Sequence, residues 1–111
     1  MALTRDFRET IVKRAQKDPA YRRALLTRGL RFVLNGSRED VAVGKAMIRD
    51  YINATIGFQA LAKRLEKKPE SLMRMFSNSG NPRLDNVAEV FHELEEYEGI
   101  QFTVTARRAA H

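Results

Sequence analysis

The stretch from Gly57 to Ser77 contains two short apolar patterns separated by a polar turn, and it constrains the fold more than any other part of the chain. In each pattern apolar residues recur at the three- and four-residue spacing of one helix face. They are Phe58, Leu61, Ala62 and Leu65 in the first pattern, and Leu72, Met75 and Phe76 in the second. Pro69 follows the polar turn and suits the first position of a helix, because the N–H that it lacks would be unpaired there. Two helices joined this closely share a core only by crossing steeply, so the stretch predicts a helix-turn-helix.

The second helix of this motif is expected to expose a polar face beside the turn. In helix-turn-helix proteins that bind DNA, the second helix enters the major groove and its side chains contact the bases. The side chains that would be exposed here are Glu70, Met73, Arg74 and Ser77. Any helical bundle also produces two amphipathic helices with a polar turn. The spacing therefore indicates DNA binding, and it leaves open a helical protein–protein interaction module as the alternative.

The chain is basic, and its charge is unevenly distributed. Its 111 residues, of which 43% are hydrophobic, suffice for a single domain with one modest core. The formal net charge is +6, with 16 Lys+Arg against 7 Asp+Glu through Lys68 and 4 against 7 from Pro69 onward. A basic excess attracts phosphate backbones, although surface charge also keeps a protein soluble. The charge supports a nucleic-acid partner without establishing one.

Residue types that catalyse reactions or bind metals are scarce. The chain has no cysteine, only two histidines and no glycine-rich phosphate-binding loop. His92 has no neighbouring His or Cys, so we interpret it as a surface or interface residue. We therefore expect no enzymatic activity, no cofactor and no metal site. No apolar run reaches the ~18 residues of a membrane helix, and the amino terminus lacks a signal-peptide core, so we expect a cytoplasmic protein that does not bind a membrane.

The remaining patterns predict an all-α fold, a bundle of about six helices with a helix-turn-helix core and a short C-terminal β-strand. Capping residues mark the helix ends: Asp18-Pro19 begins the second helix, Asn35-Gly36 ends it and Ser37 begins the third. The predicted units of one domain (1–111) are an N-terminal helical layer (1–56), the helix-turn-helix core (57–98) and the C-terminal strand (99–106).

The last predicted helix has an apolar side and an acidic side. We expect its core side to contain Leu84, Val87, Ala88, Phe91 and Leu94. We expect its exposed side to contain Glu89, Glu93, Glu95, Glu96 and Glu98. Gly99 ends the helix.

Residues 100–105 alternate apolar and polar side chains, which is typical of a strand. A lone strand leaves its backbone groups unpaired, and no second strand is evident. Ile100, Phe102 and Val104 are therefore predicted to contact a partner, either a second copy of this chain or a different protein.

The segment from about Gly57 to Val104 resembles the helix-turn-helix proteins of addiction modules, the HigA-like antidote proteins related to the phage-repressor (Xre-like) type. The residues that carry the resemblance are 57–62 (GFQALA), 71–76 (SLMRMF), the loop 80–82 (GNP) and the helix 85–91 (DNVAEVF). Two positions depart from the family pattern. Phe58 stands where the family often has Gln, and Glu66 stands in the turn where it usually has Gly. A residue other than glycine there must adopt a less favourable backbone conformation, unless the turn has another shape.

The resemblance implies a sequence-specific transcriptional regulator that binds double-stranded operator DNA as a homodimer. It further implies an antitoxin that autoregulates its operon and neutralises a ribonuclease toxin of the RelE/HigB type. The alternatives are a helical protein–protein interaction module and a stand-alone regulator with no toxin partner.

Under this resemblance the DNA-binding residues are Lys67, Lys68, Pro69, Glu70, Ser71, Met73, Arg74, Ser77, Asn78, Ser79 and Asn81. Arg74 is the first choice for a base or phosphate contact, because a guanidinium bridges two acceptors on guanine. Ser71 and the polar loop residues after the second helix are candidates for hydrogen bonds to phosphates. Lys67 and Lys68 would add attraction that does not depend on sequence, whereas Glu66 and Glu70 would repel phosphates.

Overall fold

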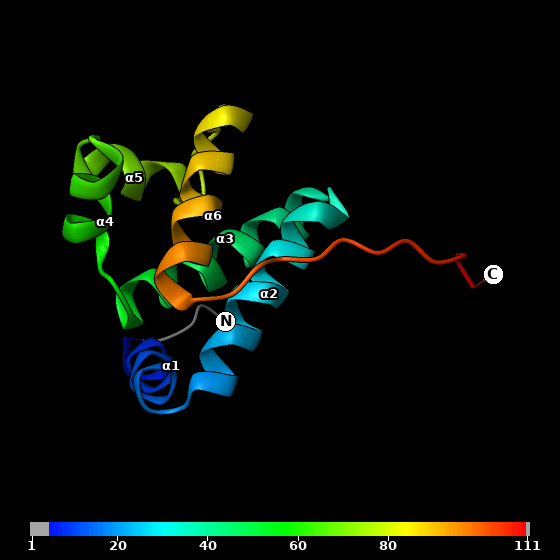
Figure 1. The fold of residues 1–111 in the computed structure, drawn as a ribbon, viewed down its shortest axis with the longest axis horizontal. Helices are drawn as coiled ribbons and strands as arrows, with labels where there is room; N and C mark the ends of the chain where they lie inside the picture. Colours follow the sequence, from blue (N-terminus) through cyan, green and yellow to red (C-terminus); the bar gives the residue numbers. More distant parts are fainter. Residues whose placement is uncertain (1–4, 111) are drawn as a thin grey trace.

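The computed structural model describes residues 5–110, and its regular structure over that range is helical (Figure 1). The six helices are α1 (Arg5–Lys17), α2 (Pro19–Asn35), α3 (Arg38–Ala54), α4 (Phe58–Leu65), α5 (Pro69–Met75) and α6 (Leu84–Glu98). The helical bundle predicted from the sequence is confirmed. None of the helices in the described range is long and apolar enough to cross a membrane.

Helices α2 and α3 pack against each other along their length and form a long antiparallel hairpin (Figure 1). The predicted caps are present: the Asp18 side chain accepts from the Tyr21 amide, Gly36 ends α2 in the left-handed conformation, and Ser37 accepts from the Asp40 amide. Gly29 and Gly44 bring the two backbones close together. A Cβ atom at position 44 would lie 2.5 Å from the Gly29 carbonyl oxygen. The hairpin therefore depends on two glycines at its crossing point.

Helices α4 and α5 are the two short helices predicted on either side of the polar turn. The apolar residues predicted to face the core are buried at Phe58, Leu61, Ala62, Leu72, Met75 and Phe76, whereas Leu65 is only half-buried. Ala62 is 1% exposed, which is consistent with a small side chain where the two helices approach each other. Gly57 precedes α4 with a positive φ of 81°. The polar turn and Pro69 separate the two helices where the sequence predicted.

The face of α6 that is buried differs in part from the face predicted to enter the core. Val90, Phe91 and Leu94 are buried, but Leu84 is 83% exposed and Ala88 is also exposed, so their assignment to the core was wrong. Val87 is half-buried. Figure 1 shows the first turn of α6 at the edge of the body, and the Leu84 side chain there borders an open hollow of about 260 Å³ instead of entering the core.

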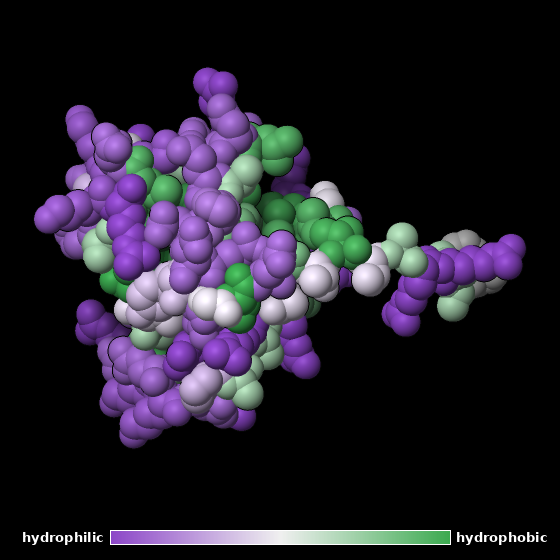
Figure 2. Space-filling model, viewed as in Figure 1, coloured by the Kyte–Doolittle hydropathy of each residue, from purple (hydrophilic) through white to green (hydrophobic). Residues whose placement is uncertain are grey.

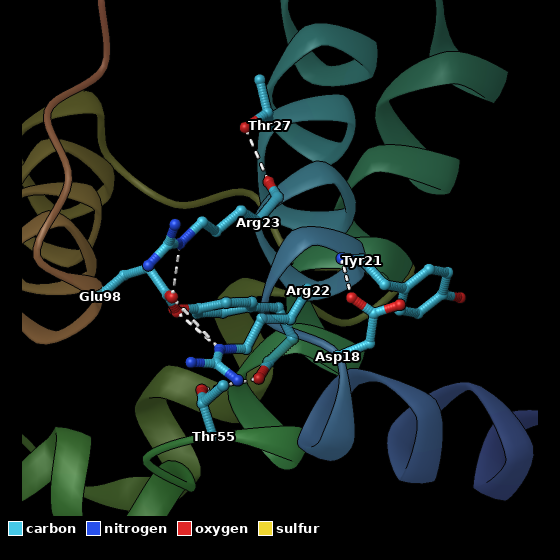
Figure 3. A network of polar contacts seen from close by, with 8 residues as sticks. Asp18, Tyr21, Arg22, Arg23, Thr27, Thr55 and Glu98 are labelled. Atoms are coloured by element: carbon cyan, nitrogen blue, oxygen red, sulfur yellow. Dashed lines mark hydrogen bonds and ion pairs between the residues drawn. The ribbon is translucent and has the colours of Figure 1, made fainter.

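Glu98, predicted on the exposed acidic side of α6, is instead buried and joins α6 to α2 and α3 (Figure 3). The Tyr51 hydroxyl donates to its carboxylate at 2.5 Å, and the Nε atoms of Arg22 and Arg23 donate at 3.1 and 3.0 Å. Burial raises the pKa of Glu98, but these hydrogen bonds together outweigh it, so the net pKa is below the usual range. Burial, and then the hydrogen bond to Glu98, raise the pKa of Tyr51 far above its ordinary value. The expectation failed because the arginines that neutralise Glu98 lie 75 and 76 residues away in sequence.

The predicted C-terminal strand is absent from the described residues. Residues 100–110 run as extended chain without regular structure, cross α2 and continue beyond the body (Figure 1). Ile100 and Phe102 pack against the core, and the Phe102 ring meets the edge of Phe91 with centroids 6.0 Å apart. The Phe102 amide donates to the Glu95 carboxylate at 2.6 Å. The strand prediction was wrong for the single chain, because the backbone amide and carbonyl groups of these residues have no second strand to pair with.

Candidate nucleic-acid interface

Helix α5 has one buried face and one exposed face. Leu72 and Met75 point into the core, whereas Glu70, Ser71, Met73 and Arg74 are exposed, Met73 at 46%. Because consecutive residues of a helix are separated by about 100°, this pattern follows from the apolar spacing seen in the sequence. The exposed face is long enough to present several side chains to one partner.

The turn before α5 contains an unusual backbone conformation. Glu66 has φ 54° and ψ 44°, and it is the only residue other than glycine with a positive φ in the described chain. The amide of Lys67 donates to the Ala62 carbonyl at 2.9 Å, which closes the end of α4. Glu66 thus adopts the left-handed conformation, which is the less favourable of the two possibilities that the sequence left open for this turn. For an L-residue this conformation costs roughly 1–2 kcal/mol.

Replacing Glu66 with glycine is expected to raise the free energy of unfolding by about 0.5–1 kcal/mol, because relief of the left-handed strain exceeds the entropy that glycine loses on folding. Urea denaturation measures this change. Glu66→Ala is the matched control: it removes the same charge but retains the strain, so it should not stabilise. Equal stabilisation by both variants would show that charge, and not backbone conformation, is responsible.

Two cations from α3 hold the C-terminal end of α5 and the loop that follows it. Arg49 Nη1 donates to the Phe76 carbonyl at 2.7 Å, and Lys45 Nζ donates to the Gly80 carbonyl at 2.9 Å. Carbonyl groups at a helix C-terminus lack intrahelical partners and carry partial negative charge, so cations stabilise them. Burial, followed by the nearby Arg8 guanidinium, lowers the pKa of Arg49, which Asp50 partly offsets. The orientation of α5 is therefore fixed by the N-terminal layer.

The loop after α5 packs closely against that helix. A Cβ atom at Gly80 would clash with the Arg74 carbonyl oxygen. The side chains of Asn78, Ser79 and Asn81 remain exposed beside the end of the helix. The loop therefore extends the exposed polar surface beyond α5.

Most of the predicted DNA-binding residues are exposed in α5 or beside its two ends, but two of them turn toward the protein. The Lys67 ammonium contacts Asn86 Oδ1 at 3.3 Å and Glu89 Oε1 at 3.5 Å, so α6 neutralises part of its charge. The Ser77 hydroxyl donates to the Arg74 carbonyl at 2.8 Å. Pro69 is half-buried at the start of α5. Lys68 and Arg74 are exposed, and within residues 5–110 no ion pair engages either side chain.

The structure adds two residues that the sequence interpretation missed. Gln59 and Lys63 of α4 are exposed, and with Pro69 they border a hollow of about 420 Å³ beside the start of α5. Both lie on the polar side of the α4 pattern, and that position was the available signal. In helix-turn-helix proteins the first helix crosses the DNA backbone. Lys63 therefore adds a cation to the same surface.

The comparisons with known proteins identify no relative. No family model, curated protein or solved structure matches the chain. The resemblance to HigA-like antidote proteins therefore stays a prediction, and the functional argument depends on the surface described above. No group of three or more His, Cys, Asp or Glu that could hold a metal ion occurs among the residues described here.

Proposed function

We propose that this chain is a sequence-specific DNA-binding transcriptional regulator that acts as a cytoplasmic homodimer. The observation that carries the proposal is the exposed face of α5, where Ser71, Met73 and Arg74 are accessible while the opposite face is core. A short helix held at a fixed angle and exposed along one side suits insertion into a major groove about 12 Å wide.

The charges around α5 support the same proposal. Three exposed cations lie on these elements: Lys63 in α4, Lys68 at the N-cap of α5 and Arg74 in its last turn. The lysines would neutralise phosphates, and Arg74 would read a base edge. Glu66 and Glu70 oppose this attraction, so we expect modest affinity for DNA of unrelated sequence and a larger share of binding from base contacts.

The resemblance to HigA-like proteins extends the proposal to an antitoxin. Such a protein would repress its own operon and would bind a ribonuclease toxin of the RelE/HigB type. A homodimer would place its two α5 helices on half-sites separated by a whole number of helical turns of DNA, about 34 Å each.

A helical protein–protein interaction module is the second candidate. Leu34 and Leu84 are 65% and 83% exposed, and large apolar side chains on a surface suit a protein partner. The two candidates differ in their response to salt, because DNA affinity falls steeply as salt rises.

Arg74→Ala is expected to weaken binding to the DNA upstream of the gene about 5- to 150-fold, which corresponds to about 1–3 kcal/mol for the loss of a bidentate base contact. A gel shift at fixed salt measures the change. Arg28→Ala is the matched control, since Arg28 is an exposed arginine of α2 and its removal changes the net charge equally. Equal affinities of the two variants would remove Arg74 from the interface.

A further inference from the structure

The C-terminal arm, residues 101–110, leaves the body as an extended chain (Figure 1). Phe102 anchors it, and from Thr103 onward its side chains are exposed, with Val104 at 95%. In the part of the chain that the structure describes, no backbone hydrogen bond reaches residues 103–106. Their amide and carbonyl groups are therefore free to pair with another strand.

A trough runs beside the arm. It has a volume of about 410 Å³ and is bordered by residues 100–105 on one side and by α2 on the other, where Leu30 and Leu34 contribute apolar side chains. Figure 2 shows apolar side chains gathered where the arm leaves the body, while polar side chains cover most of this face. An extended chain added to the arm would cover this apolar surface and satisfy the unpaired backbone groups.

We propose that the occupant is the arm of a second copy, paired antiparallel with Thr103 on the two-fold axis. The inference rests on the homodimer of the proposed function, but it does not depend on DNA binding. In this register Phe102 of each copy lies opposite the partner's Val104, which forms two identical aromatic–β-branched pairs on one face. A slip of one residue would place Phe102 opposite the partner's Thr105 and mix the apolar and polar faces.

Charge complementarity favours the same register. Arg107 of each arm lies opposite the partner's Gly99, at the C-terminal end of α6. That end carries the negative pole of the helix dipole, and the carboxylates of Glu95 and Glu96 lie in the last turns. The Glu96 side chain is 68% exposed and is accessible to an incoming guanidinium. Arg107 of one arm therefore lies beside the acidic C-terminal end of α6 in the other copy.

Single-cysteine cross-linking tests the register, because the full chain contains no native cysteine. Opposed residues of antiparallel strands have Cα atoms about 4.5–5.5 Å apart, within the range that a disulfide spans. Thr103→Cys should therefore cross-link at least tenfold faster than Gln101→Cys, whose two copies would be about 13 Å apart. A mixture of Gln101→Cys and Thr105→Cys should cross-link as a heterodimer. Equal rates for the two single variants would overturn the proposal.

The dimer dissociation constant provides an independent measurement. Val104→Lys should raise it at least tenfold in sedimentation equilibrium, and the monomer should stay folded because Val104 is exposed in the single chain. Leu84→Lys is the matched control, an exposed apolar residue outside the arm. A wild-type protein that is monomeric at tens of micromolar, or a dimer unaffected by Val104→Lys, would contradict arm pairing. Both readouts are made without DNA, so loss of DNA binding alone leaves this inference standing.

Discussion

Glu98→Ala is expected to lower the free energy of unfolding by about 3–5 kcal/mol, the cost of removing one partner from a buried ion pair. The Glu98 carboxylate accepts hydrogen bonds from Arg22, Arg23 and Tyr51, and its side chain is 1% exposed. Its loss leaves three donors without an acceptor at the junction of α2, α3 and α6. Urea denaturation followed by circular dichroism measures the change.

Glu96→Ala is the matched control for this prediction. Glu96 lies on the same helix, two residues earlier, with a side chain that is 68% exposed. Its replacement should change stability by less than about 0.5 kcal/mol, as expected for surface positions. If Glu98→Ala lowered the free energy of unfolding as little as Glu96→Ala, the hydrogen-bond network of Glu98 would not be what holds α6 against α2 and α3.

The same network predicts a dependence on pH. Because hydrogen bonds depress the folded-state pKa of Glu98, its stabilisation is present above the unfolded pKa of about 4.3 and is lost as pH falls through the folded value. Asp50 acts in the opposite direction, since burial raises its pKa and protonation favours the folded state. The stability difference between the wild type and Glu98→Gln should therefore shrink as pH falls from about 6 to about 3.

Gly44→Ala is expected to lower the free energy of unfolding by about 2 kcal/mol. The added Cβ would lie 2.5 Å from the Gly29 carbonyl oxygen and 2.8 Å from the Val33 amide nitrogen, so the α2–α3 crossing must widen. Overpacking of this kind costs about 1–3 kcal/mol, occasionally more, and the better helix propensity of alanine returns up to about 1 kcal/mol. Thermal unfolding followed by circular dichroism measures the shift.

Val43→Ala provides the comparison, because Val43 is the adjacent residue on α3 and is 44% exposed. It should change stability by less than about 0.5 kcal/mol. A neutral or stabilising Gly44→Ala would mean that α2 and α3 separate at little cost, which contradicts the close crossing.

Local chemistry was sufficient to predict much of this fold. The caps at Asp18, Gly36 and Ser37 depend on neighbours within three residues, and each has the predicted geometry. The two short helices α4 and α5 were also predictable, since their apolar spacing, the polar turn between them and Pro69 lie in one short stretch. The left-handed conformation of Glu66 was one of two possibilities that the sequence left open, the other being a turn of different shape.

Features that depend on distant residues were not predictable in the same way. Glu98 belongs to an acidic run, and only the approach of Arg22 and Arg23 makes its burial favourable. Leu84 satisfies the apolar spacing of α6, but it lies in the first turn at the edge of the core and is 83% exposed. The clamp formed by Lys45 and Arg49 needs the end of α5 to lie beside α3, which no local pattern indicates. Alternation in residues 100–105 predicted a strand, which these residues do not form, because a strand requires a second strand to pair with.

Methylation protection on the DNA upstream of the gene tests the central claim most directly, because guanine N7 lies in the major groove. If α5 reads that groove, the wild-type protein and Arg28→Ala should protect guanines in two segments a whole number of helical turns apart, at about 0.15 M salt. Arg74→Ala should lose that protection. Protection no stronger than on unrelated duplex DNA, or protection that persists unchanged in Arg74→Ala, would contradict the assignment of α5 as the DNA-reading helix.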